Sequence, residues 1–595
     1  MKSILKKSVS LLLSVILCIS AVVVASAEEA APCDCGNTPS IIVPGLMQSE
    51  TYLYNEDGSI NTDYEAPFFL EDTDTIISTA MGKVLMPLLK VLLTQQDTNG
   101  EFAQAFADTL GSILGDKIRA DENGNSIFNV DASHYAGSFA ACTPEQQAHI
   151  LNNVPIQGFL DAAGEDHLYY FSYHSFGNLD QITERLYNLI QQVKEETGHD
   201  KVNLVPISQG GVVTNNLLEL YPDVVDSFDK MVYVIPCLDG TAIISDIYVN
   251  GLLDDPEAIY GYMIPMLLDD DMTSKLVKIA LRLLPEDVLQ NMLDKAADTL
   301  FGVTLKNNTT MWAFLKTKDY EIAADKYLSG EENAEIRRQT DSYQRARVNS
   351  DANILRAIEH GVQVFNIVDY NVALYPIVDS WNKINADGVI DLDSTSMGAY
   401  AAPVGETLPA GYTQQGNSFG TCTDPSHNHI DPYNIVDAST GLLPDHTFYF
   451  YNAPHEETGR NDVLIGLIID ILIDDNFTSV YSYPEKYPQF NEARRGRDLR
   501  NLSARAHDFL ATAGEDEYPE LRAALAKVDD LIDDTVVNYE ETNAAKAELE
   551  REYKIANNES VTKETSFFDT VLEKVVDGIF AMVEKQFPNR SFSGK

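Results

Sequence analysis

The stretch Lys201 to Tyr221, KVNLVPISQGGVVTNNLLELY, predicts the local structure around which the chain is built. Residues 202–205 are apolar enough for a short buried strand, and the apolar spacing over 212–220 predicts a helix. Between them lies PISQGG (206–211), a tight turn centred on Ser208. A sharp strand-to-helix turn of this kind exposes a serine hydroxyl above the edge of a sheet.

The turn indicates a nucleophile elbow, whose usual pattern is G-x-S-x-G. Gly210 occupies the second glycine position and Gly211 follows it, but Pro206 replaces the first glycine. That glycine normally lets strand and helix pack closely, so Pro206 is a departure from the pattern. The alternative is a Ser-Gly loop that joins a strand to a helix without chemistry.

A second strand should end near this elbow. Residues 40–49, SIIVPGLMQS, form a short apolar run that ends in a Pro-Gly turn. In such a site one backbone N–H from this loop and one from the residue after the nucleophile stabilise an oxyanion. We therefore expect the oxyanion hole to be formed by the N–H groups of Leu46 and Gln209.

The order of the remaining elements predicts a mostly parallel sheet. A strand over 167–173 and a helix over 182–193 precede the elbow, and further strands are expected at 231–236, 362–368 and 447–451, with a closing helix at 463–473. Alternation of strands and helices is typical of α/β proteins. We predict the α/β class, with the α/β-hydrolase fold.

Two helical blocks interrupt this alternation, at about 66–155 and 250–350. Their apolar helices, near 76–93 and 262–284, are expected to form caps that cover Ser208 and shelter an acyl chain. Pro87 should kink or divide the first helix. For the first block, ordinary core helices are the alternative.

A serine hydroxyl becomes a nucleophile when a histidine removes its proton and an acid orients that histidine. His455 follows the last strand, whereas His446 precedes it and would emerge at the wrong end of the sheet. Two acids compete: Asp369 ends the strand at 362–368 and Asp387 lies in a later D-G-V loop, so position alone slightly favours Asp369. Either could instead bond its own backbone, the commonest role of a loop aspartate.

Several motifs, in this order, resemble the lecithin–cholesterol acyltransferase family and related secreted lipases. They are VPG at 43–45 with Ser49, YFSY at 170–173, SQGG at 208–211, PCLDG at 236–240, DGV at 387–389 and His455. The similarity covers roughly residues 40–475. The segment 174–176 departs from it, because the family continues its aromatic strand with Tyr-Asp-Trp-Arg.

The resemblance implies that Asp387 is the acid of a Ser208–Asp387–His455 triad. It implies a serine esterase, a lipase or O-acyltransferase, that acts on acyl esters, chiefly of lipids, and needs no cofactor. The alternative is a non-catalytic hydrolase-fold exoprotein whose C-terminal helices bind a surface glycan or protein. Whether water or an alcohol accepts the acyl group is open.

Charge and the N-terminus bear on location. A basic start, an apolar run over 11–24 and the small residues Ala25-Ser26-Ala27 predict a signal peptide at 1–27. The net charge of −49 disfavours binding to nucleic acids or anionic membranes. No later stretch is apolar enough for a transmembrane helix. We expect a secreted, extracellular protein of Gram-positive type.

Metal sites are weakly indicated. Cys422, Asp424, His427 and His429 form a C-x-D-x-x-H-x-H pattern, but no second spaced pair accompanies it. A polar loop is therefore the preferred interpretation, and no metal is predicted. Cys33-Asp34-Cys35 is read in the same way, as an N-terminal segment.

The domain prediction follows from composition. After the signal peptide, 28–480 should form the hydrolase domain and 481–491 a linker. Residues 492–560 should form a helical module, which resembles the FIVAR-type modules of Gram-positive surface proteins and suggests cell-surface or glycan contact. Residues 561–595 read as an amphipathic helical tail.

Overall fold

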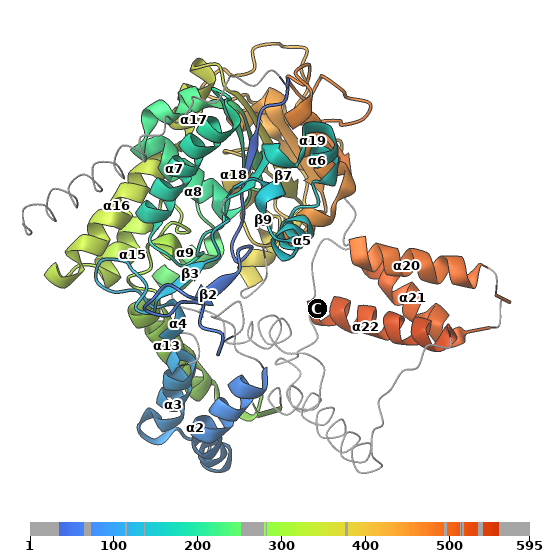
Figure 1. Ribbon diagram of the computed structural model, residues 1–595. Coiled ribbons are helices and arrows are strands. Elements are labelled where there is room, and N and C mark those ends of the chain that lie inside the picture. The colour runs from blue at the N-terminus through green and yellow to red at the C-terminus, as the bar shows by residue number, and fades with distance from the viewer. Residues whose placement is uncertain are drawn as a thin grey trace, which may run out of the picture.

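The computed structural model describes residues 35–64, 73–112, 116–135, 137–250, 279–280, 282–374, 379–492, 497–511, 513–514, 517–532 and 539–557. Its main feature is a parallel seven-stranded sheet (Figure 1). From one edge to the other the strands are β13 (Phe490–Glu492), β12 (Thr447–Tyr451), β7 (Gln363–Tyr370), β6 (Phe228–Val234), β5 (Val202–Pro206), β1 (Ser40–Val43) and β4 (Leu168–Tyr170). The sheet confirms the predicted α/β class.

Alternate residues of the central strands enter two separate hydrophobic cores, because successive side chains of a strand point to opposite faces. Ile41 and Val43 belong to one core and Ile42 to the other. Helices cover both faces, as the α/β-hydrolase fold requires (Figure 1). The first face carries α7 (Leu179–Thr197), α8 (Gln209–Leu220), α16 (Ala334–Val348) and α17 (Ser350–Glu359), and the second carries α5 (Pro144–Asn153), α6 (Gln157–Ala163) and α19 (Asp462–Ile473).

The structure also contains shorter helices and strands outside the seven-stranded sheet. They are β2 (Thr51–Leu53), β3 (Val130–Ala132), α4 (Asp116–Ile118), α9 (Ala242–Asn250), α14 (Thr309–Trp312), α15 (Tyr320–Tyr327), β8 (Val372–Ala373), β9 (Asn385–Ala386), α18 (Leu392–Thr395), β10 (Tyr400–Ala401) and β11 (Val436–Asp437). The pairs β2–β3, β8–β9 and β10–β11 are antiparallel.

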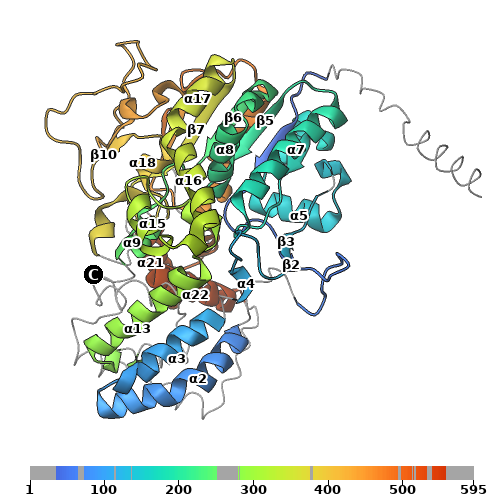
Figure 2. The ribbon, with the colours of Figure 1, turned by 90° about the vertical axis from the view of Figure 1, so that its left-hand side faces the viewer.

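The first helical block, predicted to cap Ser208, is arranged differently in the structure. Its apolar helix is α2 (Thr73–Thr94), which contains Pro87 without being divided, and it packs with α3 (Glu101–Leu110) and α13 (Glu286–Thr299) around a small core of their own. This group stands apart from the sheet (Figure 2). The later part of the block, α5, lies on the sheet itself. An amphipathic pattern shows that a helix has an apolar face but not which surface covers it.

Residues 481–491, predicted to be a linker, are instead part of the sheet domain. Their last residues begin β13, which pairs in parallel with β12, and Tyr487 is buried in the core of the second face. A strand of three residues carries too little alternation to be recognised in sequence. The described part of the sheet domain therefore extends to residue 492, not 480.

Three C-terminal helices pack on one another around Leu502, Leu525 and Leu549. They are α20 (Arg497–Leu510), α21 (Pro519–Ile532) and α22 (Tyr539–Ala556). The predicted signal peptide, the tail at 561–595 and most of the helix expected at 262–284 lie outside the described residues. Within the described residues, no helix is both long and apolar enough to span a membrane.

Two truncated proteins test the revised boundary. A chain ending at residue 496 should keep the melting temperature of the sheet domain, because β13 is retained. A chain ending at 480 should be destabilised by about 3 kcal/mol or more, the usual cost of removing one large buried aromatic side chain, here Tyr487. Thermal unfolding of both measures this. Equal melting temperatures would mean that β13 contributes nothing.

Candidate active site

Ser208 lies in a strained turn between β5 and α8. Its backbone has φ 52° and ψ −113°, outside the regions that residues with a side chain favour. The Ser208 N–H donates to the Val234 carbonyl at 3.0 Å, and the Cys237 N–H donates to the Ser208 carbonyl at 3.1 Å. Both backbone groups of Ser208 are thus tied to β6 and the loop after it, which holds the strained conformation in place.

Two glycines allow this turn to sit close to the sheet. A Cβ on Gly210 would lie 2.1 Å from the Val43 carbonyl oxygen, and a Cβ on Gly211 would lie 2.7 Å from the Pro236 side chain. Any larger residue at either position would push α8 away from β1 or from the loop after β6. Pro206 ends β5 opposite Val43, so the substitution of the pattern's first glycine leaves the elbow intact.

His455 reaches Ser208 from the loop after β12. Its Nε2 lies 3.0 Å from the Ser208 Oγ, and its Nδ1 lies 2.7 Å from Oδ2 of Asp387. The His455 N–H also donates to the Asp387 carbonyl at 2.8 Å. Because an ionised carboxylate only accepts hydrogen bonds, Nδ1 carries the ring proton and Nε2 presents its lone pair to the serine.

Asp387 is fully buried in a turn that fixes its carboxylate. Its Oδ1 accepts from the N–H groups of Val389 at 2.9 Å and Ile390 at 2.7 Å, while Oδ2 faces His455. Gly388 supplies the positive φ of 99° that the turn needs. The carboxylate therefore has one oxygen for its own backbone and the other for the imidazole.

The rival residues lie elsewhere. Asp369 is buried at the end of β7 and accepts a hydrogen bond from Thr458 Oγ1 at 2.5 Å. Burial raises the pKa of Asp369 well above its ordinary value. His446 precedes β12 and packs against the ring of Phe365, at the other end of that strand from His455.

Opposing effects act on His455. Burial disfavours the charged imidazolium, but the charge and hydrogen bond of Asp387 outweigh it, with smaller contributions from Glu456 and Asp369. The net result raises the pKa of His455 from its ordinary 6.5 to about 9. The site is therefore built to stabilise a positive charge on this imidazole.

The loop after β1 passes beside the serine. A Cβ on Gly45 would lie 3.1 Å from Cβ of Ser208. The N–H groups of Leu46 in this loop and of Gln209 at the start of α8 make no hydrogen bond within the described part of the chain. Both expected oxyanion donors are thus available beside the serine.

Side chains that the sequence analysis did not assign hold this loop. Tyr173 Oη donates to the Pro44 carbonyl at 2.6 Å, the Met47 N–H donates to Ser175 Oγ at 2.8 Å, and the Gln209 side chain donates to the Ser175 carbonyl at 2.8 Å. Residues 173–175 include the part that departs from the family pattern. In the sequence, only the position of residues 173–175, just after a strand that ends near the elbow, could have indicated that they hold the loop after β1.

A cavity of about 570 Å³ opens beside Ser208 and His455. Its lining is mainly apolar. It comes mostly from α9, from α14 and the turn after it, from α19, from the loop after α5 and from the Asp387 turn. Examples are Ile243, Ile244, Met311, Phe314, Val389, Leu464, Ile465 and Ile468. No described residue of α2 lines it. Such a volume suits a small ligand that is largely buried.

Comparisons with known proteins found a match among solved structures only. No family model matches the chain, and no curated protein sequence matches it. A solved structure described as "The crystal structure of Tle4-Tli4 complex" contains a chain with 12% sequence identity and a TM-score of 0.30, over 73% of this chain and 98% of that one.

The charge of Asp387 can be tested on His455 directly. NMR titration of the imidazole should give a pKa above 6.5, and Asp387→Asn should lower it. Asp369→Asn is the matched control and should change it less, because Asp369 bonds Thr458 rather than His455 and makes a smaller contribution to the pKa of His455 than Asp387.

The raised pKa of His455 also affects the stability of the folded protein. A pKa raised by folding means that His455 stabilises the native state fully below pH 6.5, and that this stabilisation is lost as the pH rises towards about 9. Denaturant unfolding of wild type and Asp387→Asn across this range should show the loss in wild type only. A loss of equal size in both proteins would contradict the assignment.

Proposed function

We propose that this protein is a serine esterase that cleaves esters of apolar acyl groups through an acyl-enzyme intermediate. The observation that carries the proposal is the continuous hydrogen-bonded chain from Ser208 through His455 to Asp387, set in the wall of an apolar cavity. This arrangement of nucleophile, base and orienting acid is what acyl transfer requires.

In the first half of the reaction, Ser208 Oγ attacks the ester carbonyl carbon and its proton passes to His455 Nε2. The carbonyl oxygen becomes an oxyanion, which the N–H groups of Leu46 and Gln209 stabilise. The C–O bond to the alcohol then breaks, and His455 gives its proton to the departing alkoxide. The products are an acyl ester on Ser208 and a free alcohol.

In the second half, His455 removes a proton from water or from a second alcohol, whose oxygen attacks the acyl-serine. The bond to Ser208 Oγ breaks, and the serine recovers its proton from His455. Throughout, Asp387 keeps Nδ1 protonated and stabilises the imidazolium. An alcohol acceptor would make the same residues an O-acyltransferase.

The cavity supports an apolar acyl group as the part of the substrate that is recognised. Ile243, Ile244, Phe314, Ile465 and Ile468 line it with apolar side chains, and the charged residues of the lining, Glu456 and Arg460, belong to the segment that begins at His455. Each methylene that moves from water into such a lining contributes about 0.8 kcal/mol. Medium or long acyl chains, as in lipids, fit this lining better than acetate.

Export of this esterase is supported by the sequence of residues 1–27 alone, and surface or glycan contact by the likeness of the C-terminal helical module to FIVAR-type modules. No described residue of the module, α20 to α22, lines the cavity beside Ser208. Recovery of the chain without residues 1–27 from the culture medium of a Gram-positive host would support export, and retention of the uncleaved chain in the cytoplasm would contradict it.

The triad proposal predicts the effect of single substitutions on ester hydrolysis. Ser208→Ala and His455→Ala should each lower kcat by ~10³-fold or more, since the members act as one unit. Asp387→Asn should lower it less, and Asp369→Asn least. Release of p-nitrophenol from soluble esters measures all four. If Asp369→Asn were more damaging than Asp387→Asn, the acid would be wrongly assigned.

The cavity predicts a dependence on acyl length. For wild type, kcat/KM should rise by up to about fourfold per added methylene until the cavity is filled. Ile244→Trp should abolish this rise and leave acetate hydrolysis nearly unchanged. Ile322→Trp is the control, because Ile322 is exposed on α15. A preference of wild type for acetate would exclude an acyl-binding cavity.

A further inference from the structure

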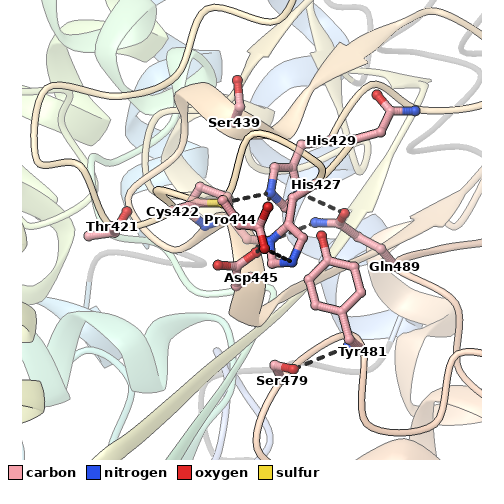
Figure 3. A network of polar contacts seen from close by, with 12 residues as sticks. Thr421, Cys422, His427, His429, Ser439, Pro444, Asp445, Ser479, Tyr481 and Gln489 are labelled. Atoms are coloured by element: carbon pink, nitrogen blue, oxygen red, sulfur yellow. Dashed lines mark hydrogen bonds and ion pairs between the residues drawn. The ribbon is translucent and has the colours of Figure 1, made fainter.

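Four side chains that can bind a metal converge from the two segments on either side of β11, between β10 and β12 (Figure 3). They are Cys422, His427, His429 and Asp445, and their donor atoms all lie within 4.8 Å of one another. Cys422 Sγ lies 3.4 Å from His427 Nδ1 and 3.4 Å from His429 Nε2. Asp445 Oδ1 lies 2.8 Å from His427 Nδ1 and 3.3 Å from His429 Nε2.

These separations are close to those within a tetrahedral coordination shell. With Zn–S near 2.3 Å and Zn–N or Zn–O near 2.0 Å, tetrahedral geometry places nitrogen and oxygen ligands about 3.3 Å apart and sulfur and nitrogen about 3.6 Å apart. The four distances above therefore differ from the tetrahedral values by about half an ångström at most.

Outer contacts orient the imidazole of His429. Its Nδ1 lies 2.9 Å from Gln489 Oε1, and the Gln489 amide nitrogen donates to the carbonyls of Pro444 at 2.7 Å and Thr447 at 3.2 Å. The amide oxygen therefore faces His429 and accepts the Nδ1 proton. This leaves the lone pair of Nε2 directed at Cys422 and Asp445, as a metal ligand requires.

Asp424, which the sequence pattern suggested as a ligand, lies on the outer side of His427. Its Oδ2 is 3.7 Å from Nε2 of His427, whereas Nδ1 of that ring faces the cluster. The fourth donor is instead Asp445, which the fold brings in from the start of β12. The ring of Tyr481 lies 4.1 Å from that of His427 and shields it.

Hydrogen bonds alone do not satisfy all the polar atoms of this cluster. His427 can donate from Nδ1 to Asp445, and the single S–H of Cys422 can donate to His429. The Asp445 oxygen would still face the lone pair of His429 Nε2 at 3.3 Å, beside a fully buried imidazole. A divalent cation removes this repulsion, because a thiolate and a carboxylate neutralise its charge while both imidazoles stay neutral.

We propose that Cys422, His427, His429 and Asp445 bind one Zn²⁺ in a closed structural site. One thiolate, two imidazoles and one carboxylate form a ligand set that suits zinc rather than magnesium or calcium. Four protein ligands leave no position for a substrate. The site lies before β12, whereas His455 follows that strand, so it serves the fold and not the esterase reaction.

The ion would fasten a segment that lacks regular structure. Residues 402–429 form neither helix nor strand, and such long loops need a constraint to hold one conformation. Three of the ligands, Cys422, His427 and His429, belong to this segment, and Asp445 connects it to the sheet. Zinc binding is thereby coupled to the stability of β12 and of the loop that carries His455.

The test measures metal in the purified full-length chain. Mass spectrometry of metals should show one zinc per chain fewer in Cys422→Ser than in wild type. After exchange for Co²⁺, wild type should show a thiolate-to-cobalt charge-transfer band that Cys422→Ser lacks. Cys35→Ser is the matched control, because Cys35 lies 3.2 Å from His167 and 3.5 Å from His199 in another group of donors.

Retention of the cobalt band in Cys35→Ser would support the proposal and assign the thiolate to Cys422, even if Cys422→Ser fails to fold. A chelator should also lower the melting temperature of wild type and leave that of Cys422→Ser unchanged. Equal zinc content in wild type and Cys422→Ser, absence of the cobalt band from wild type, or its loss in Cys35→Ser would each overturn the proposal.

Discussion

The close approach of two glycines to the sheet is the contact on which the site depends. Gly210 lies against the Val43 carbonyl and Gly211 against Pro236, and no side chain would fit at either place. This contact fixes α8 on the sheet and keeps Ser208 in a backbone conformation that costs about 1–3 kcal/mol. The packing energy of the surrounding core maintains it, so the serine hydroxyl is presented before any substrate arrives.

A second constraint is electrostatic. His455 and Asp387 come from different loops, yet their backbones are joined by a hydrogen bond and their side chains by another. Burial disfavours charge on the imidazole, while the carboxylate beside it favours that charge more strongly. The site thus lowers the energy of the state that forms when the serine loses its proton, which is the state that acyl transfer needs.

Local patterns predicted the parallel sheet, the elbow and the placement of His455, because each depends on residues near one another in sequence. Other features depend on contacts between distant segments. Asp369 lies at the end of β7 and Asp387 follows that strand in the chain; both are fully buried, and only their hydrogen-bond partners tell them apart. Asp445 joins the cysteine–histidine cluster through the fold, whereas spacing pointed to the nearer Asp424. The strand at 490–492 was too short to show a period.

Labelling with a fluorophosphonate tests the central claim, that His455 and Asp387 activate Ser208, most directly. The account predicts one adduct per chain, located on Ser208 by peptide mass spectrometry. It also predicts a labelling rate that rises with pH through the titration of His455 and falls sharply in His455→Ala. Absence of an adduct, an adduct on another residue, or a rate unaffected by His455→Ala would contradict it.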